Sequence, residues 1–110
     1  MYVRIYWTRI QPDSLPSIEK KYRQLATSIP GRLLRWVTQD VADPESVITV
    51  TLWDSEKSVR DWEGSDAYQR GVEAVRPYLA GSQAISLFEI KVDDPAGLLD
   101  QIKAAAGRPQ

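Results

Sequence analysis

The chain has 110 residues and carries 14 Lys and Arg against 15 Asp and Glu, a formal net charge of −1. This length is typical of one domain, and the balanced charge argues against a protein that binds nucleic acid or an anionic membrane, which would show a basic bias. The absence of Cys and His excludes disulfides, thiolate nucleophiles and Cys-ligated metal sites, and it removes the commonest metal ligand and general acid–base.

Residues 2–10 alternate as in a β-strand. One face of this strand carries Val3, Ile5 and Trp7, and the other carries Tyr2, Arg4, Tyr6 and Thr8. A strand with bulky side chains on both faces is not expected to leave one face simply in water. The pattern therefore predicts a second covering layer.

A helix is expected next. Pro12 and Asp13 end the strand, Asp13 or Ser14 can cap the helix, and Pro16 is tolerated in a first turn. Apolar residues then recur at spacings of three and four, at Leu15, Ile18, Tyr22, Leu25 and Ile29. This stripe predicts an amphipathic helix that Pro30-Gly31 brings to an end.

Two strands and a broken helix follow. Residues 32–41 and 47–53 predict a hairpin with a turn at Asp43-Pro44. Asp54 and Ser55 offer helix caps, Gly64 interrupts the helix, and Ser65 or Asp66 can cap it afresh. The apolar positions of the two helical pieces are Val59, Trp62, Tyr68, Val72, Val75 and Leu79.

The C-terminal part predicts a turn at residues 80–82, a fourth strand over 84–92 and a short helix over 95–106. Asp93 and Asp94 before Pro95 are typical of a helix start. The apolar face of this helix carries Leu98, Leu99 and Ile102.

The order of elements predicts an α+β fold. It is a ferredoxin-like βαββαβ antiparallel sheet with both helices on one face and a short C-terminal helix, in a single domain 1–110 with a core over 1–93. The other face of the sheet is then bare and apolar, and a second copy of the chain would cover it. We assign Tyr6 and Thr51 to this bare face and expect a homodimer.

A family resemblance lies in the run TLWDSEKSVRDWEGSDAYQR, which begins at Thr51. The strand-ending Trp53, Ser55, the helical Trp62, then Ser65 and Tyr68 resemble the signature of the antibiotic biosynthesis monooxygenase family. This family belongs to the dimeric α+β barrel superfamily, and the resemblance covers about residues 1 to 93. It implies a homodimer in which each subunit has a pocket between sheet and helices, with Trp62 lining it.

One branch of that family degrades heme with an Asn near the end of the first strand, the helical Trp and a His ten residues later. Here Trp7 stands at about the Asn position and Val72 at the His position, so only Trp62 of the three is kept. The resemblance therefore disfavours heme degradation. We expect no cofactor and no metal.

A second branch oxidises aromatic phenols to quinones without a cofactor, and Trp62 and Tyr68 resemble its functional residues. The resemblance implies that these two are catalytic and places Ser58 where that branch has an Asn. We predict Trp7, Ser58, Val72 and Arg4 as substrate-binding residues. The expected substrate is a small aromatic molecule, quinol- or anthrone-like. Indole N–H and phenol O–H groups are suitable donors to a substrate phenolate.

Plainer interpretations stay open for the same residues. Trp36 and Trp53 fit simple packing between strands, and Trp62 and Tyr68 fit a helix-to-sheet core. Arg4 fits a buried cation paired with a carboxylate such as Glu89. The alternative function is a non-catalytic member of the superfamily that holds a small ligand or serves a structural role.

The N-terminus reads MYVRIYW, which is unlike a signal peptide, and no apolar run approaches the length of a membrane-spanning helix. We therefore expect a cytoplasmic protein whose partners are a small aromatic or apolar molecule and a second copy of the chain.

Overall fold

The computed structural model describes residues 1–25 and 28–106, which form one sheet and the helices that cover it. The elements in chain order are β1 (Tyr2–Ile10), α1 (Leu15–Gln24), β2 (Arg32–Gln39), β3 (Ser46–Trp53), α2 (Glu56–Glu63), α3 (Asp66–Val75), the 3₁₀ turn η1 (Arg76–Tyr78), β4 (Leu79–Glu89) and α4 (Leu98–Ala106). No helix within these ranges is long and apolar enough to cross a membrane.

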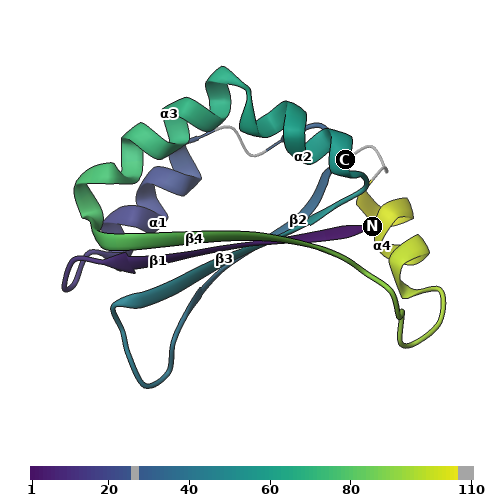
Figure 1. Ribbon diagram of the computed structural model, residues 1–110, viewed down its shortest axis with the longest axis horizontal. Helices are drawn as coiled ribbons and strands as arrows, with labels where there is room; N and C mark the ends of the chain where they lie inside the picture. Colours follow the sequence, from purple (N-terminus) through teal and green to yellow (C-terminus); the bar gives the residue numbers. More distant parts are fainter. Residues whose placement is uncertain (26–27, 107–110) are drawn as a thin grey trace.

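The sheet is antiparallel with the strand order β2-β3-β1-β4. Figure 1 shows α1, α2 and α3 over one face of the sheet and α4 beside one end of it. The predicted ferredoxin-like α+β fold is therefore confirmed, with the first and third strands adjacent as the right-handed crossovers require.

The strand register decides which side chains lie under the helices. Arg4 pairs with Thr51, and Tyr6 pairs with Thr49, so these four side chains share the face that the helices cover. The apolar core lies toward one end of this face and is formed by Ile10, Ile18, Val47 and Val75, each at most 3% exposed. The middle of the same face is polar and buried, at Arg4, Thr8, Thr49 and Thr51. Such a polar centre beside an apolar core is where a site can form.

The opposite face of the sheet is apolar and has no helix across its middle (Figure 1). Its side chains come from all four strands and include Val3, Ile5, Trp7, Trp36, Ile48, Val50 and Phe88. Trp36 and Phe88 are 53% and 54% exposed. The predicted bare face therefore exists, but its assignment to Tyr6 and Thr51 was wrong, because both point toward the helices.

The predicted break between α2 and α3 is confirmed. Ser55 Oγ accepts a hydrogen bond from the Ser58 backbone N–H at 3.1 Å, and Ser65 Oγ accepts one from the Tyr68 N–H at 3.2 Å, so each helix has its own cap. Ser14 precedes α1, but its hydroxyl donates to the Gln11 carbonyl at 2.7 Å and does not cap the helix.

Several predicted boundaries were wrong. Residues 80–82 are not a turn, because β4 already begins at Leu79 and passes through Gly81 with φ at +85°. α4 begins at Leu98, three residues later than predicted. α1 ends at Gln24, where Leu25 becomes extended. The predicted helix ran on to Ile29, and residues 26–27 of that stretch lie outside the described residues.

Candidate substrate pocket

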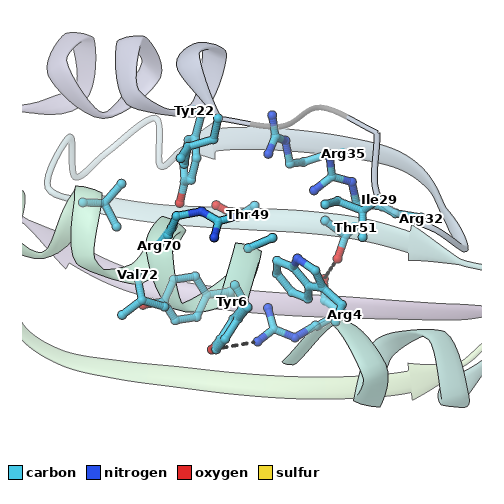
Figure 2. Close-up of a pocket in the computed structure, with 16 residues that line it drawn as sticks. Arg4, Tyr6, Tyr22, Ile29, Arg32, Arg35, Thr49, Thr51, Arg70 and Val72 are labelled. Atoms are coloured by element: carbon cyan, nitrogen blue, oxygen red, sulfur yellow. Dashed lines mark hydrogen bonds between the residues drawn. The ribbon is translucent and has the colours of Figure 1, made fainter. Parts of the chain in front are cut away.

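A pocket lies between the sheet and helices α1, α2 and α3 and is partly open to solvent (Figure 2). Its enclosed volume is about 90 Å³, and its walls are mainly apolar. For comparison, an enclosed cavity of roughly 150 Å³ holds one benzene molecule. This volume is smaller than one benzene ring requires, so an aromatic ligand would extend into the open mouth of the pocket.

Arg4 is the charged centre of the pocket floor. It is 3% exposed, and its Nε donates to the Glu63 carboxylate at 3.1 Å. A terminal amino group of the same guanidinium donates to the Tyr68 hydroxyl oxygen at 3.4 Å. The predicted carboxylate partner, Glu89, was wrong: it is exposed and pairs with Lys91 at 2.8 Å. Because its charge is compensated and its donors are held, the Arg4 side chain has one fixed position.

Aromatic rings surround this guanidinium. Its central carbon lies 5.0 Å from the Trp62 ring centroid and 5.6 Å from that of Tyr68, close enough for cation–π attraction. The two rings themselves meet edge to face with centroids 4.7 Å apart. Trp62 lies in the last turn of α2 and Tyr68 in the first turn of α3, so the break at Gly64 brings the two rings together beside Arg4.

The indole N–H groups of Trp53 and Trp62 differ in their hydrogen bonding. Trp53 is fully buried and donates its indole N–H to Thr51 Oγ1 at 2.8 Å, as a packing residue should. Within residues 1–25 and 28–106, the Trp62 N–H makes no hydrogen bond, although the ring lines the pocket. A ligand oxygen can therefore take this donor.

Tyr68 is also left with a proton to donate. Its oxygen accepts from Arg4, and in the part of the chain that the structure describes it has no acceptor of its own. A phenol O–H polarised by a guanidinium is a stronger donor than a free one. Trp62 and Tyr68 thus each keep one donor beside the Arg4 cation, and donors of this kind can stabilise a negative oxygen on a bound molecule.

Tyr6 lies beside this corner and stays neutral. Its hydroxyl donates to Gln83 Oε1 at 2.6 Å. Burial, aided by Tyr22 and Tyr68, raises the pKa of Tyr6 to about 12, while Arg4 opposes the shift. Sequence reasoning did not place Tyr6 in the site, although its strand alternation with Arg4 is the signal that could have found it.

Three further arginines line the pocket. Arg32 and Arg35 reach in from β2 and Arg70 from α3 (Figure 2). The Arg35 guanidinium lies 5.2 Å from the centre of the Tyr22 ring. Burial, together with the neighbouring Arg35, lowers the pKa of Arg32 to about 10, so the group is still a cation at neutral pH. Sequence reasoning missed all three.

The structure brings together four of the six residues predicted for the site, Arg4, Trp62, Tyr68 and Val72. The other two lie elsewhere. Trp7 is on the opposite face of the sheet and donates its N–H to Ser46 Oγ at 2.8 Å. Ser58 lies on α2 and donates to Asp54 at 2.8 Å, outside the pocket lining.

The chain was compared with known protein families and with curated proteins. The family model described as antibiotic biosynthesis monooxygenase matches residues 1–74. No curated protein matches the chain.

Solved structures resemble the chain over most of its length. A candidate antibiotic biosynthesis monooxygenase from Caulobacter crescentus has a TM-score of 0.73 at 20% identity, covering 83% of this chain and 90% of that one. One from Chloroflexus aurantiacus has a TM-score of 0.65 at 23% identity, covering 84% and 96%. One from Nitrosomonas europaea has a TM-score of 0.68 at 16% identity, covering 81% and 97%. At such identities the likeness shows a shared fold.

Proposed function

The chain belongs to the antibiotic biosynthesis monooxygenase family, and from this premise we propose that it is a cofactor-independent monooxygenase. Its substrate is a small aromatic molecule, quinol- or anthrone-like, held in the pocket beneath α2 and α3. The observation that carries the proposal is the pair of donors at Trp62 and Tyr68, which have no acceptor of their own among the described residues and stand over Arg4.

The proposed reaction converts a CH₂ group conjugated with a phenol to a carbonyl. The substrate first loses a proton, and Trp62 N–H and Tyr68 O–H donate hydrogen bonds to the resulting oxyanion. The electron-rich anion then reduces dioxygen directly and takes up one oxygen atom. The second oxygen atom leaves as water, so CH₂ and O₂ become C=O and H₂O.

Arg4 acts through these donors. It is a positioning residue, because Glu63 and Tyr68 occupy its described contacts. Its charge raises the acidity of a phenol bound above it and lowers the free energy of the anion. The described pocket lining has no carboxylate, so we assign the departing proton to water at the open side.

We also propose that two copies of the chain pair through the bare sheet face. The exposed rings of Trp36 and Phe88 support this, since a monomer would leave a contiguous apolar surface in water. Closing two such faces gives the dimeric α+β barrel that the family resemblance implies.

One observation favours the non-catalytic alternative, a binding protein for a small ligand. The enclosed volume of about 90 Å³ is smaller than the space that benzene needs. A substrate and dioxygen together require the pocket walls to move apart, whereas a small bound ligand does not.

Oxygen consumption with anthrone, whose CH₂ group is the reacting carbon, tests the proposal. We expect uptake above the buffer rate and one anthraquinone formed for each O₂ consumed. Tyr68→Phe should lower the enzymatic rate by about tenfold or more, since it removes one of the two oxyanion donors. Binding without any turnover, by contrast, would favour the alternative.

A further inference from the structure

The charge of the pocket is opposite to that of the chain as a whole. The net charge of the chain is −1, yet four arginines line the pocket and the described lining contains no Asp, Glu or Lys. An excess of one sign in a partly enclosed site concentrates the field there and selects ligands of opposite charge. The charge of the pocket therefore favours an anionic ligand.

The four arginines are not equivalent. Arg4 is already paired with Glu63 at 3.1 Å and bonded to the Tyr68 hydroxyl, so its donors are not available to a ligand carboxylate. In the described ranges, no carboxylate lies within 4.0 Å of Arg35 or Arg70. Arg35 instead lies over the Tyr22 ring. The positive charge left for a ligand is thus on the side away from Arg4.

The register of β2 places two of these arginines, Arg32 and Arg35, on the same face of the sheet. Arg32 and Arg35 are three residues apart and would face opposite ways in a regular strand. A register shift between Arg32 and Leu34 turns both toward the helices. Burial lowers the pKa of Arg32 most, and the like charge of Arg35 lowers it further. An anion beside Arg35 would offset the repulsion between the two guanidinium groups.

These observations lead us to propose that the natural ligand is an aromatic acid. Its ring lies by Trp62 with a phenolic oxygen toward Tyr68, and its carboxylate lies on the basic side of the pocket, where Arg35 and Arg70 attract it and Arg32 lies beside Arg35. The placement of the phenolic end rests on the proposed function, and the carboxylate end rests on the arginines alone.

The shape and chemistry of the pocket agree with this assignment. Figure 2 shows Arg32 and Arg35 together on one side and Arg70 on another, while Arg4 lies below them. Arg70 is exposed and marks the open mouth, where the part of a ligand that exceeds the enclosed volume must lie. Arginine donors match the two oxygens of a carboxylate in a planar, bidentate way, as a lysine would not.

The test compares two probes of the same ring system, 6-hydroxy-2-naphthoate and 2-naphthol, by titration calorimetry with the full chain. The acid should bind about tenfold or more tightly than the naphthol, because charge-assisted hydrogen bonds contribute more than neutral contacts. Its affinity, and not that of the naphthol, should fall between 20 and 500 mM salt, concentrations at which exposed charges become screened (roughly 20 to 4 Å in Debye length).

Arg70→Gln and Arg35→Gln should each reduce the affinity for the acid by about fivefold to tenfold and change naphthol binding by less than about twofold. Arg70 is exposed on α3, so its replacement does not endanger the fold. Arg76→Gln is the matched control, because Arg76 pairs with Glu73 outside the pocket and should leave both affinities unchanged.

Equal affinity for the two probes, or an acid affinity that both pocket variants leave unchanged, overturns the inference. That result is separable from a failure of the proposed function. Oxidation of neutral anthrone without a preference for the acid in binding refutes only the aromatic-acid ligand. Tight, arginine-dependent binding of the acid supports the ligand class even where no oxygen is consumed.

Discussion

Arg4 Nε and Glu63 Oε2 lie 3.1 Å apart, so a buried cation of β1 is held by a carboxylate at the end of α2, 59 residues away. This pair ties the helix break to the sheet and fixes the floor of the pocket. Glu63 is the less buried partner, with 24% of its side chain exposed, and also accepts from Arg60 at 3.0 Å.

Replacing Glu63 should therefore destabilise the fold through Arg4. We expect Glu63→Gln to lower the free energy of unfolding by roughly 1–3 kcal/mol, since it leaves a buried guanidinium without its counter-charge. Urea denaturation measures this. The control is Glu89→Gln, whose exposed pair with Lys91 should contribute less than about 1 kcal/mol. Equal losses for the two variants would show that the Arg4–Glu63 pair has no special role.

Ionisation of Tyr6 should lower the free energy of unfolding at high pH. Its pKa in the folded protein is about 12, above the ordinary value of 10.0, mainly because of burial. The folded state therefore holds the phenolic proton more tightly than the unfolded state does, and this contribution is complete below pH 10. It is lost as the pH rises from 10 to 12.

Other groups titrate in the same range, so the measurement is the difference between wild type and Tyr6→Phe in urea denaturation from pH 9 to 12. Wild type should lose more stability over this interval than the variant. Parallel curves for the two proteins would mean that Tyr6 ionises as freely in the folded state as in the unfolded one.

A substitution at Gly31 tests how closely the Ser58 side chain packs against the backbone there. Gly31 has φ at +82°, and a Cβ built there would lie 2.2 Å from Ser58 Oγ. Gly31→Ala should cost about 1–2 kcal/mol for the left-handed backbone and a further 1–3 kcal/mol for the clash. Gly81→Ala is the control: its φ is +85°, but nothing lies within 4 Å, so only the backbone cost applies. A smaller loss at Gly31 than at Gly81, in thermal unfolding, would contradict the close packing of Ser58.

Much of this molecule follows from local patterns. Ser55, Gly64 and Ser65 predict the cap, break and second cap of the α2–α3 pair, and the structure has all three. Trp62 and Tyr68 therefore meet where the sequence places a bend. Strand alternation likewise puts Arg4 beneath the helices once the sheet order is known.

The basic side of the pocket could not be predicted, because it depends on a register shift. Without the irregularity between Arg32 and Leu34, Arg35 and Arg32 would face opposite ways. The partner of Arg4 was missed for a related reason. Glu89 lies opposite Tyr2 in the register, and the residue opposite Arg4 on β4 is Leu87. Periodicity does not report such one-residue offsets between distant strands.

The bare sheet face should make the protein a dimer. We expect light scattering at micromolar concentration to give twice the chain mass of 12.4 kDa. Trp36→Lys should shift the protein toward monomer, because it places a charge in the apolar face, while Trp36→Phe should keep the dimer. A monomeric wild type at these concentrations would refute the pairing.

Trp62 allows packing and ligand binding to be separated, with Trp53 as its counterpart. The two rings lie 5.3 Å apart, but Trp53 is fully buried and its N–H is bonded to Thr51. Trp62 is only partly buried, lines the pocket, and has an N–H with no acceptor among the described residues. We expect Trp53→Phe to lower stability by more than about 1 kcal/mol, because it leaves Thr51 without its donor and a gap in the core.

Trp62→Phe should cost less stability than Trp53→Phe, since no internal hydrogen bond is lost and part of the ring already faces a cavity. Its affinity for 6-hydroxy-2-naphthoate should fall by about tenfold, because the lost indole N–H no longer orients the phenolic oxygen. Trp62→Ala should cost below the roughly 3–5 kcal/mol of a fully buried large-to-small change. Thermal unfolding and calorimetry on the three variants measure both quantities. A large stability loss with ligand affinity unchanged in Trp62→Phe would make Trp62 a core residue and remove it from the site.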